Sequence, residues 1–453
     1  MKTVAIPIET KVREFDGKLW LGLNLVSRGY RVILGPHDEV SSTFDITEPD
    51  IYLTKDPGDP NIDIFKRLRS AGISVCGLDT EGAVFESLDQ FGHNKKEILN
   101  HLDAFFAWGE KPANEVRQHH DDKRNLHVSG NPRFDLLQPQ LRSIYQDRAV
   151  PISKKYGEYI LFNTSFSIPN PYSQRQITKM EETLGTLEQQ KRTYFFRVFY
   201  SFMQTIYYLQ ELFPKTNIII RPHPSENNNT YTKAFREYDR IHVEDSGDVR
   251  TWIAGATVTV HHTSTTGIES ALIGVPVVSY RPVQSESYGA KLPQVVSKEA
   301  LTQEELAEYI SDQLHTDQPY ELTDDQKQYL KQYIHNIDES AAENICRVIG
   351  SLNINGEKKY GMLKPTLGEK IERRIKSFRW SDQAITAYDT IHKLAGNESH
   401  QEQRRYHAEK FPGLTKKEII NTVDQMDGVA ELGDIHVDDI PLTNNTFSLT
   451  LQG

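Results

Sequence analysis

The sequence predicts an α/β fold made of two parallel-sheet domains in tandem, followed by C-terminal helices. Three observations support this prediction. Short apolar runs alternate with amphipathic segments over residues 1–150, the same pattern restarts near residue 158, and a polar stretch containing Pro and Gly separates the two regions. Apolar runs joined by helical crossovers are typical of parallel sheets covered on both faces. At 453 residues the chain is also too long for one hydrophobic core.

The first domain is expected at residues 1–150. Its predicted strands lie at residues 2–8, 30–35, 50–56, 72–79, 103–110 and 125–132. A helix is predicted at residues 17–29, where Gly29 closes it.

The second domain is expected at residues 151–350, with the boundary inside residues 145–157. Its predicted strands lie at residues 158–166, 217–224, 240–245, 257–262 and 275–282, with a long helix at 186–213 and a short one at 248–256. Residues 351–453 are expected to form a helical, basic extension and a polar, acidic tail, whose weak periodicity is compatible with partial disorder.

Composition excludes several classes of protein. The net charge of −11 speaks against general nucleic-acid binding, which needs a basic surface. Cys76 and Cys346 stand far apart in apolar surroundings, which favours reduced core thiols over a disulfide. The sequence contains no CxxC or HExxH motif, so no metal site is expected. Without a signal-peptide core or a long apolar run, the expected location is the cytoplasm.

The stretch IIIRPHPSE places polar side chains directly after a buried strand. Arg221 offers a planar fork of donors that suits phosphate, and His223, held between two prolines, can donate to a phosphate or act as an acid. A second interpretation is a proline-rich turn with a surface arginine. Because ligands of open parallel sheets bind beyond the carboxyl ends of strands, we favour a binding site here.

The stretch VTVHHTSTTGIESALIGVP has the same character. A strand ends at His262, hydroxyl residues occupy positions 263–266, and a helix begins near Gly267. Unpaired backbone N–H groups at a helix start, together with hydroxyls, form an anion site. Glu269 has two interpretations: it forms a capping box with Thr266, or it reaches a ribose.

Together the two stretches resemble the nucleotide-binding half of GT-B glycosyltransferases. The related groups are capsule and surface-polysaccharide transferases, bacterial sialyl- and Kdo-transferases, and teichoic-acid glycerophosphotransferases. The stretches PIETKVREFDGKLWLGLNLVSRGYRVILG and VSGNPRFDLL resemble bacterial surface carbohydrate biosynthesis proteins more narrowly, and the resemblance extends over residues 1–290. It implies a GT-B-like fold with two Rossmann-like domains whose sheets face a cleft.

The resemblance also implies roles for individual residues. His223 and Pro224 match a His-Pro motif beside the donor's phosphate and base, and Glu269 matches a carboxylate near the ribose. Ser264 and Thr265 match a phosphate-holding hydroxyl pair, although the run here reads Thr-Ser-Thr-Thr rather than Ser-Ser. No cofactor or metal is implied. The expected donor-site residues are Arg221, His223, Pro224, Ser225, His262, Thr263, Ser264, Thr265, Thr266, Gly267 and Glu269.

The acceptor side and the catalytic base are expected on loops of the first domain. Glu9, Asp79 and Glu81 follow strands, and each is a candidate base or nucleophile or, alternatively, a helix cap. The candidate acceptor or hinge residues are Arg13, Asn131 and Arg133. Alternatively, Arg133 belongs to a simple turn in which it pairs with Asp135.

The leading functional hypothesis is a metal-independent glycosyltransferase that moves a sugar, preferably a CMP-activated ulosonic acid, onto a glycan or lipid-linked acceptor. The alternatives are a UDP-sugar 2-epimerase, a CDP-glycerol glycerophosphotransferase and a non-catalytic nucleotide-sugar-binding protein. Residues 358–380 carry eight Lys or Arg against two Glu. This segment is either a solvated face or a peripheral contact with the inner face of the membrane.

Overall fold

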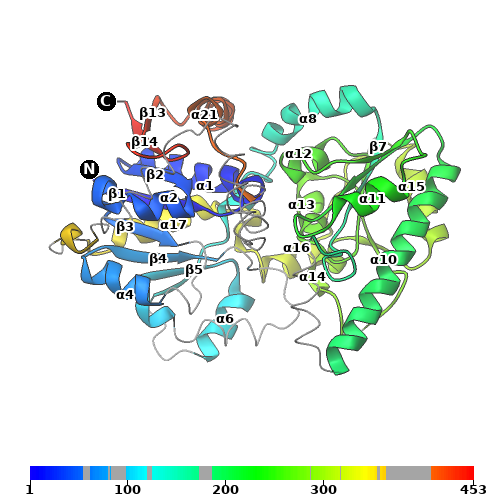
Figure 1. Cartoon of the computed structure of the whole chain (residues 1–453), viewed down its shortest axis with the longest axis horizontal. Helices are drawn as coiled ribbons and strands as arrows, with labels where there is room; N and C mark the ends of the chain where they lie inside the picture. The colour runs from blue at the N-terminus through cyan, green and yellow to red at the C-terminus, as the bar shows by residue number, and fades with distance from the viewer. Residues whose placement is uncertain are drawn as a thin grey trace, which may run out of the picture. The chain divides into compact units, whose positions relative to one another are not determined.

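The computed structural model of the chain describes residues 1–54, 62–79, 82, 98–119, 125–172, 186–285, 287–316, 318–354, 358–363 and 410–452. The chain divides into two compact units (Figure 1). Unit 1 combines the residues up to Leu136 with those from Lys331 onward, and unit 2 consists essentially of Leu137–Leu330.

Unit 1 contains an eight-stranded sheet in the order β13-β14-β2-β1-β3-β4-β5-β6. Strands β1 to β6 are parallel to one another, while β14 joins β2 in the antiparallel direction. The strands are β1 (Thr3–Ile8), β2 (Arg31–Pro36), β3 (Ile51–Thr54), β4 (Ser74–Leu78), β5 (Ala104–Ala107), β6 (Leu126–Val128), β13 (Ile435–Asp439) and β14 (Phe447–Leu451).

Helices cover this sheet, and its central strand β1 is buried throughout. Alternate strand residues such as Ala5, Ile33 and Phe105 pack in one cluster with Phe65 and Leu68 of α4, as the two-residue period of a strand requires. The helices are α1 (Lys11–Val26), α2 (His37–Ser42), α3 (Phe44–Thr47), α4 (Ile62–Ser70), η2 (Leu99–His101), α6 (Glu110–Gln118), α7 (Pro132–Asp135), η3 (His335–Ile337), α17 (Ala341–Ser351), η4 (Tyr360–Leu363) and α21 (Lys416–Ala430).

Unit 2 contains a six-stranded parallel sheet in the order β12-β11-β10-β7-β8-β9. The strands are β7 (Tyr159–Asn163), β8 (Asn217–Arg221), β9 (Ile241–Val243), β10 (Val258–His261), β11 (Val277–Tyr280) and β12 (Lys298–Ala300). The helices are α8 (Ser143–Tyr156), α10 (Thr186–Leu212), α11 (Asn228–Ala234), α12 (Val249–Ala254), α13 (Thr265–Ile273), α14 (Lys291–Val295), α15 (Gln303–Gln313) and α16 (Asp324–Lys331).

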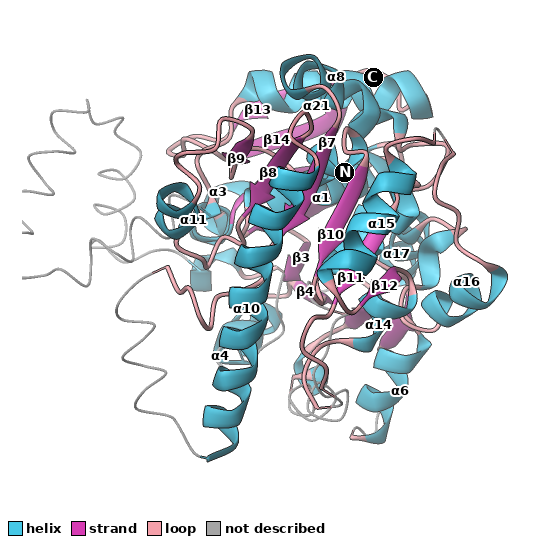
Figure 2. Cartoon of the chain, turned by 90° about the vertical axis from the view of Figure 1, so that its right-hand side faces the viewer, coloured by secondary structure: helices cyan, strands magenta, loops and turns pink. Residues whose placement is uncertain are grey.

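The long helix α10 covers one face of the second sheet (Figure 2). Its buried residues Val198, Phe202 and Ile206 pack against Phe162 of β7 and Ile220 of β8. The predicted helix at 186–213 is therefore confirmed by α10, which ends one turn before β8 begins.

Two features differ from the sequence prediction. Residues 145–157, expected as a polar boundary, lie largely in helix α8, which contains Pro151 and belongs to unit 2. Tertiary packing outweighs the cost of this proline, because α8 buries Tyr145 and Ala149. Helix α1 begins at Lys11 rather than near residue 17, because the Glu14 carboxylate accepts the backbone N–H groups of the chain just before the helix.

The C-terminal residues also differ from the expected polar tail. Residues 410–452 supply helix α21 and the hairpin β13–β14, and the hairpin extends the sheet of unit 1 beyond β2 (Figure 1). Phe447 and Leu449 of β14 are almost fully buried, although the surrounding sequence is polar. Pairing with β2 supplies the burial that such a short strand lacks by itself.

Candidate functional site

The topology of each sheet marks one place where a ligand is expected. In unit 1 the strand order reverses between β1 and β3, and in unit 2 it reverses between β7 and β10. At such a switch point the adjacent crossovers diverge to opposite faces, which leaves a crevice beyond the carboxyl ends of the strands. We call these two places the unit 1 edge and the unit 2 edge.

The unit 2 edge brings together the ends of three neighbouring strands. Asn163 of β7 lies in register with Arg221 of β8 on one side and with His261 of β10 on the other. The two predicted donor stretches begin at Arg221 and at His262, directly after His261, and they therefore flank the strand that carries Asn163. The sequence prediction missed Asn163, whose only signal is a polar residue at the end of the run YILFN.

Arg221 has a structural function that the sequence did not indicate. Its Nη1 and Nη2 atoms donate to the carbonyl oxygens of Ser246 (2.8 Å) and Gly247 (2.9 Å), and its guanidinium lies over the Trp252 ring at 5.2 Å. Burial lowers the pKa of Arg221 to about 10, so it stays charged at neutral pH. The expected phosphate ligand thus holds the loop between β9 and α12.

Glu226 organises the RPHPSE turn. Its buried carboxylate accepts the backbone N–H groups of Phe166 (2.8 Å) and His223 (3.1 Å), and the hydroxyls of Thr164 (3.0 Å) and Tyr231. Burial raises the pKa of Glu226, and these four donors oppose the rise. The carboxylate therefore fixes the loop after β7 to the loop after β8, a role that only the tertiary structure reveals.

His223, Pro224 and Ser225 lie on the outer side of this turn. His223 and Pro224 are exposed, and Ser225 is half-buried. The backbone N–H of Ser225 donates to Nδ1 of His223 (3.2 Å), so in the neutral ring the proton is on Nε2. His223 can therefore present an N–H donor from the unit 2 edge.

Helix α13 begins at the unit 2 edge with Ser264 as its N-cap. The Ser264 hydroxyl accepts from the backbone N–H of Thr266 at 3.3 Å, so the expected capping box of Thr266 and Glu269 does not start this helix. Thr263, Ser264, Thr265 and Thr266 are half-buried. Four hydroxyl side chains thus gather at the positive end of a nine-residue helix.

Gly267 and Glu269 lie inside the start of α13. A Cβ atom on Gly267 would stand 2.2 Å from Nε2 of His261, so this position has room only for glycine. Glu269 is 4% exposed, and it adds to the larger effect of Asp248 in raising the pKa of the buried Arg250 in α12. The carboxylate that was expected near a ribose is therefore buried among neighbouring helices.

The two adjacent histidines are both buried and neutral. Burial lowers the pKa of His261 to about 3 and that of His262 to about 4. His261 accepts from the Ser264 N–H at Nδ1 (3.3 Å) and lies 2.9 Å from Ser297 Oγ through Nε2. His262 was expected at the phosphate, but it lies among aromatic rings with its Nε2 3.0 Å from the Tyr194 hydroxyl. His262 directly follows the last residue of β10, and successive residues at a strand point to opposite faces, which separates the pair.

The amide of Asn163 has an unusual environment. Both its oxygen and its nitrogen are buried, and neither has a hydrogen-bond partner among the residues that the structure describes. Each such group costs about 1–3 kcal/mol if nothing satisfies it. A buried polar group without a hydrogen-bond partner at the switch point of a sheet is typical of a binding site, where a ligand, a water molecule or a movement of a loop supplies the missing hydrogen bonds.

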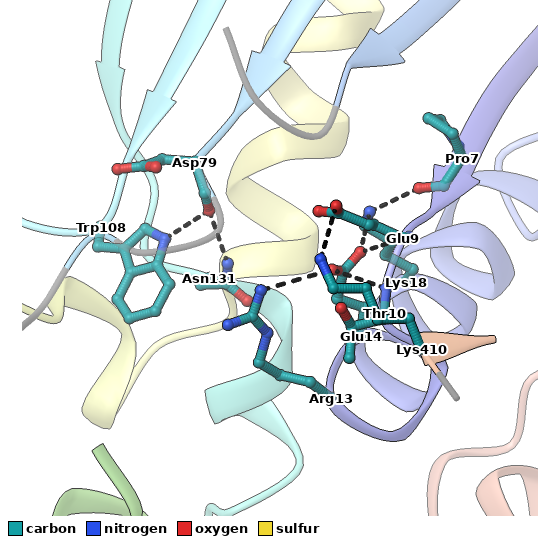
Figure 3. Close-up of polar contacts among 10 residues, drawn as sticks. All are labelled: Pro7, Glu9, Thr10, Arg13, Glu14, Lys18, Asp79, Trp108, Asn131 and Lys410. Atoms are coloured by element: carbon teal, nitrogen blue, oxygen red, sulfur yellow. Dashed lines mark hydrogen bonds and ion pairs between the residues drawn. The ribbon is translucent and has the colours of Figure 1, made fainter. Parts of the chain in front are cut away.

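The unit 1 edge is charged (Figure 3). Glu14 accepts the backbone N–H groups of Glu9 (3.1 Å) and Thr10 (3.2 Å) and pairs with Lys18 at 2.6 Å. Lys18 also donates to the carbonyl of Pro7 at 2.5 Å. Burial by itself would raise the pKa of Glu14, but Lys18 and the backbone donors lower it overall. This buried pair fixes the turn from β1 into α1.

Glu9 and Asp79 differ in exposure. Glu9 is about one-third exposed, and its carboxylate pairs with Lys410 at 3.1 Å (Figure 3). Asp79 is 3% exposed, and its backbone carbonyl accepts from Trp108 Nε1 (2.7 Å) and Asn131 Nδ2 (3.1 Å). Of these two candidate bases, Glu9 is the more accessible. The third candidate, Glu81, lies outside the described residues.

Asn131 and Arg133 belong to the same edge. The Asn131 side chain caps α7 by accepting from the Arg133 N–H at 3.1 Å. The Arg133 guanidinium lies over the rings of Trp108 (4.7 Å) and Phe134 (4.8 Å). Arg133 lines one pocket together with Arg13, Glu14, Gly17, Lys18, Leu78, Asn131 and Pro132.

Asp135 anchors the returning C-terminal part of the chain to unit 1. Its carboxylate accepts the backbone N–H groups of Ala341 (2.8 Å) and Ala342 (2.9 Å), and side-chain groups of Asn336 and Ser340. Burial raises the pKa of Asp135 to about 6, against the effect of these donors. Asp135 therefore holds the start of α17, a different role from the expected turn with Arg133.

Metal-binding groups and membrane-spanning helices can be examined only among the described residues. Among the described residues, no group of His, Cys, Asp and Glu could hold a metal ion. Within the same residues, no helix combines the length and apolar character needed to cross a bilayer. Of the basic segment 358–380, residues 358–363 are described: Lys358 donates to the carbonyl of Gly72 at 2.6 Å, and Tyr360 donates to that of Glu48 at 3.0 Å. The remainder, residues 364–380, lies outside the described part.

Comparison with known proteins bears on the fold. No protein-family model and no curated protein sequence matches the chain. Among solved structures, the wall teichoic acid polymerase TagF has a TM-score of 0.50 at 10% identity, covering 77% of this chain and 88% of that one. Two UDP-GlcNAc 2-epimerases are also similar. The one from Methanocaldococcus jannaschii has a TM-score of 0.48 at 13% identity, covering 77% of this chain and 99% of that one. The one from Neisseria meningitidis has a TM-score of 0.47 at 13% identity, covering 78% of this chain and 100% of that one.

At these identities the similarity concerns the fold alone. The six parallel strands β1 to β6 of unit 1, the parallel sheet of unit 2 and the likeness to TagF confirm the predicted GT-B-like fold class with two Rossmann-like domains and C-terminal helices. Activity, donor and acceptor need a separate argument from the two edges.

Proposed function

We propose that the protein is a glycosyltransferase that moves a sugar from a nucleotide donor onto a surface-glycan precursor. The observation that carries this proposal is the unit 2 edge, where four hydroxyl residues begin helix α13 beside the reversal point of a parallel sheet. Hydroxyls and a helix N-terminus suit the phosphate of a nucleotide, and both stabilise the negative charge that develops on the leaving group.

In this proposal His223 donates its Nε2–H to the donor phosphate. The Glu226 network places the His223 backbone, and Ser225 fixes the ring tautomer. Arg221 and His262 act indirectly, by holding a loop and filling the core. The phosphate charge is then balanced by hydroxyls, the α13 dipole and an imidazole N–H, without a metal.

The unit 1 edge supplies the acceptor side in this proposal. Glu9 is the favoured base, because its side chain is more accessible than that of Asp79. A carboxylate there can take the proton of an acceptor hydroxyl as the hydroxyl attacks the sugar. Lys410 positions the Glu9 carboxylate from the C-terminal part of the chain.

The favoured donor is a CMP-activated ulosonic acid, as the His-Pro and hydroxyl stretches indicate. A second candidate is glycerophosphate transfer from CDP-glycerol, since the RxHP stretch at Arg221 also resembles that of teichoic-acid glycerophosphotransferases. Both use a cytidine nucleotide. A UDP-sugar 2-epimerase is the alternative that uses uridine, and turnover of UDP-N-acetylhexosamine without any acceptor would identify it.

A calorimetric panel of CMP, UDP, GDP and CDP-glycerol tests the proposal. We expect cytidine nucleotides to bind the full chain, and Ser264→Ala and His223→Ala each to weaken binding by about tenfold, since a hydrogen bond to a charged group contributes about 1.5–3 kcal/mol. His315→Ala is the matched control, because His315 bonds locally to the Ser311 carbonyl at the end of α15. Tight binding of UDP alone would contradict the donor choice, and unchanged binding in both site variants would contradict the site.

A further inference from the structure

The start of helix α13 pairs most of its own backbone N–H groups. The Thr266 N–H donates to the Ser264 hydroxyl at 3.3 Å, and the Gly267 N–H donates to the Ser264 carbonyl at 3.1 Å. Among the residues that the structure describes, the Thr265 N–H has no acceptor and the buried Thr266 hydroxyl has no partner. Polar groups left unpaired at the positive end of a helix suit a phosphate oxygen.

His261, the last residue of β10, takes up the N–H group of the N-cap itself. Its Nδ1 atom accepts from the Ser264 N–H at 3.3 Å. Because the hydroxyl and the carbonyl of Ser264 receive the next N–H groups of the helix, this bond holds the residue on which the first turn depends. One imidazole nitrogen of the strand therefore fixes the start of the helix.

A chain of hydrogen bonds sets the tautomer of the His261 ring. Since Nδ1 accepts, the proton of the neutral ring is on Nε2, which donates to Ser297 Oγ at 2.9 Å. The Ser297 hydroxyl donates in turn to the Pro293 carbonyl in α14 at 2.6 Å. Burial lowers the pKa of His261 to about 3, so at neutral pH the ring keeps Nδ1 as an acceptor.

Close packing fixes the position of the ring. His261 is 0% exposed, and the first turn of α13 lies directly against it. A Cβ atom on Gly267 would stand 2.2 Å from Nε2 and 2.6 Å from Cε1 of the ring. Glycine at this position therefore allows the imidazole and the helix start to touch.

We infer that His261 is a positioning residue of the donor site, which holds the Ser264 N-cap of α13 so that the Thr265 N–H stays open to the donor phosphate. This inference rests on the proposed function, in which the unit 2 edge takes the nucleotide. His261 is completely buried, so it acts through Ser264 and not by its own contact with the donor.

Calorimetric titration of the full chain with CMP and, separately, with pyrophosphate tests the role of His261. His261→Asn and His261→Leu are similar in size and both lose the contact with Ser297, but only asparagine keeps an acceptor in the place of Nδ1. We expect His261→Leu to weaken both probes by about tenfold and His261→Asn to stay within about threefold of wild type. Thermal unfolding of both variants measures stability separately, because a purely structural role would weaken binding in step with stability.

His242→Asn is the matched control. His242 lies in β9 of the same sheet, where its Nε2 is 3.1 Å from Oδ1 of Asn217, and its loss should leave both probes unchanged. Equal weakening in His261→Asn and His261→Leu would overturn the inference, since the acceptor would then have no effect. Equal affinity in wild type and His261→Leu would overturn it as well.

Gly267→Ala provides a second test that leaves His261 in place. The added Cβ atom should displace the ring or the first turn of α13 and weaken both probes by about tenfold. Asparagine at position 261 lacks the two ring atoms closest to that Cβ, so adding His261→Asn to Gly267→Ala should recover part of the lost affinity. Unchanged affinity in Gly267→Ala, or no recovery in the double variant, would overturn the inference.

The two probes separate this inference from the proposed function. If wild type binds pyrophosphate but no nucleotide, and His261→Leu still weakens pyrophosphate, the transferase proposal fails and the role of His261 at a phosphate site remains. If wild type and every His261 variant bind CMP equally, this inference alone fails. If neither probe binds wild type, both fail.

Discussion

The two sheet edges place very different groups at equivalent positions of the same type of fold. At the unit 1 edge, the first strand leads into a buried ion pair, Glu14 with Lys18. At the unit 2 edge, the corresponding strand ends at the uncharged Asn163, beside the neutral His261. One topology can therefore hold a site that depends on charge and a site that depends on hydroxyl, amide and backbone groups. This difference agrees with the proposal that one edge handles proton transfer and the other a nucleotide.

The largest effect is expected from breaking the buried ion pair of unit 1. Glu14→Gln leaves Lys18 charged with its side chain only 5% exposed, which should lower the free energy of unfolding by about 3–5 kcal/mol. Lys18→Met added to Glu14→Gln should recover a large part of the loss. Urea unfolding of both variants measures this coupling.

Glu110→Gln is the matched control, because Glu110 pairs with Arg117 on the surface of the same unit. It should change the free energy of unfolding by no more than about 1 kcal/mol. If Glu14→Gln also lowers the free energy of unfolding by no more than about 1 kcal/mol, the stability of the unit 1 edge does not depend on the ion pair.

The two buried histidines of unit 2 and Asp135 of unit 1 should respond to acid in opposite directions. His261 and His262 have pKa values near 3 and 4 in the folded chain and 6.5 in the unfolded chain, so the unfolded state binds more protons between these limits. Stability from each histidine is complete above pH 6.5 and falls by about 1.4 kcal/mol per pH unit as pH drops toward its folded pKa.

Asp135 in unit 1 has the reverse sign. Its folded pKa of about 6 exceeds the unfolded value of 3.8, so the folded state binds more protons and unit 1 gains stability as pH falls from 6 to 4. Hydrogen exchange at pH 7, 5.5 and 4.5 should detect earlier opening of β10 in unit 2 than of β1 in unit 1. His262→Phe should reduce the acid sensitivity of unit 2, and equal opening of both strands at every pH would contradict the assignment.

The smallest effect on stability is expected at Asn163. Asn163→Leu replaces a buried amide that lacks a partner among the described residues with an apolar group of similar shape, so stability should change by about 1 kcal/mol or less and can increase. Nucleotide binding should weaken, because the amide belongs to the switch point of the sheet. A strongly destabilised variant would mean that Asn163 is a structural residue, as Glu14 is in unit 1. Thermal unfolding and calorimetry measure the two quantities separately.

The sequence alone indicated that polar residues follow the buried strands. Strands that end in polar residues were visible at Glu9, Asp79, Asn131, Arg221 and His262, because buried strands are apolar and their ends are not. It did not reveal which of these polar groups form hydrogen bonds within the protein. Arg221 donates to carbonyl groups of a loop about 25 positions further along the chain. The Glu226 carboxylate accepts the backbone N–H of Phe166, which lies 60 positions earlier. Asn163 and Lys410 were missed because neither carries a local motif.

The sequence by itself determined the fold class, since apolar runs and their spacing follow from the period of strands and helices. It also indicated where along the chain polar residues follow buried strands. Only the tertiary structure decided which of these polar side chains bond within the protein, because hydrogen bonds and ion pairs join residues whose separation in sequence carries no signal. The clearest case is the unit 1 edge, where Lys410 reaches Glu9 across 401 positions of the chain.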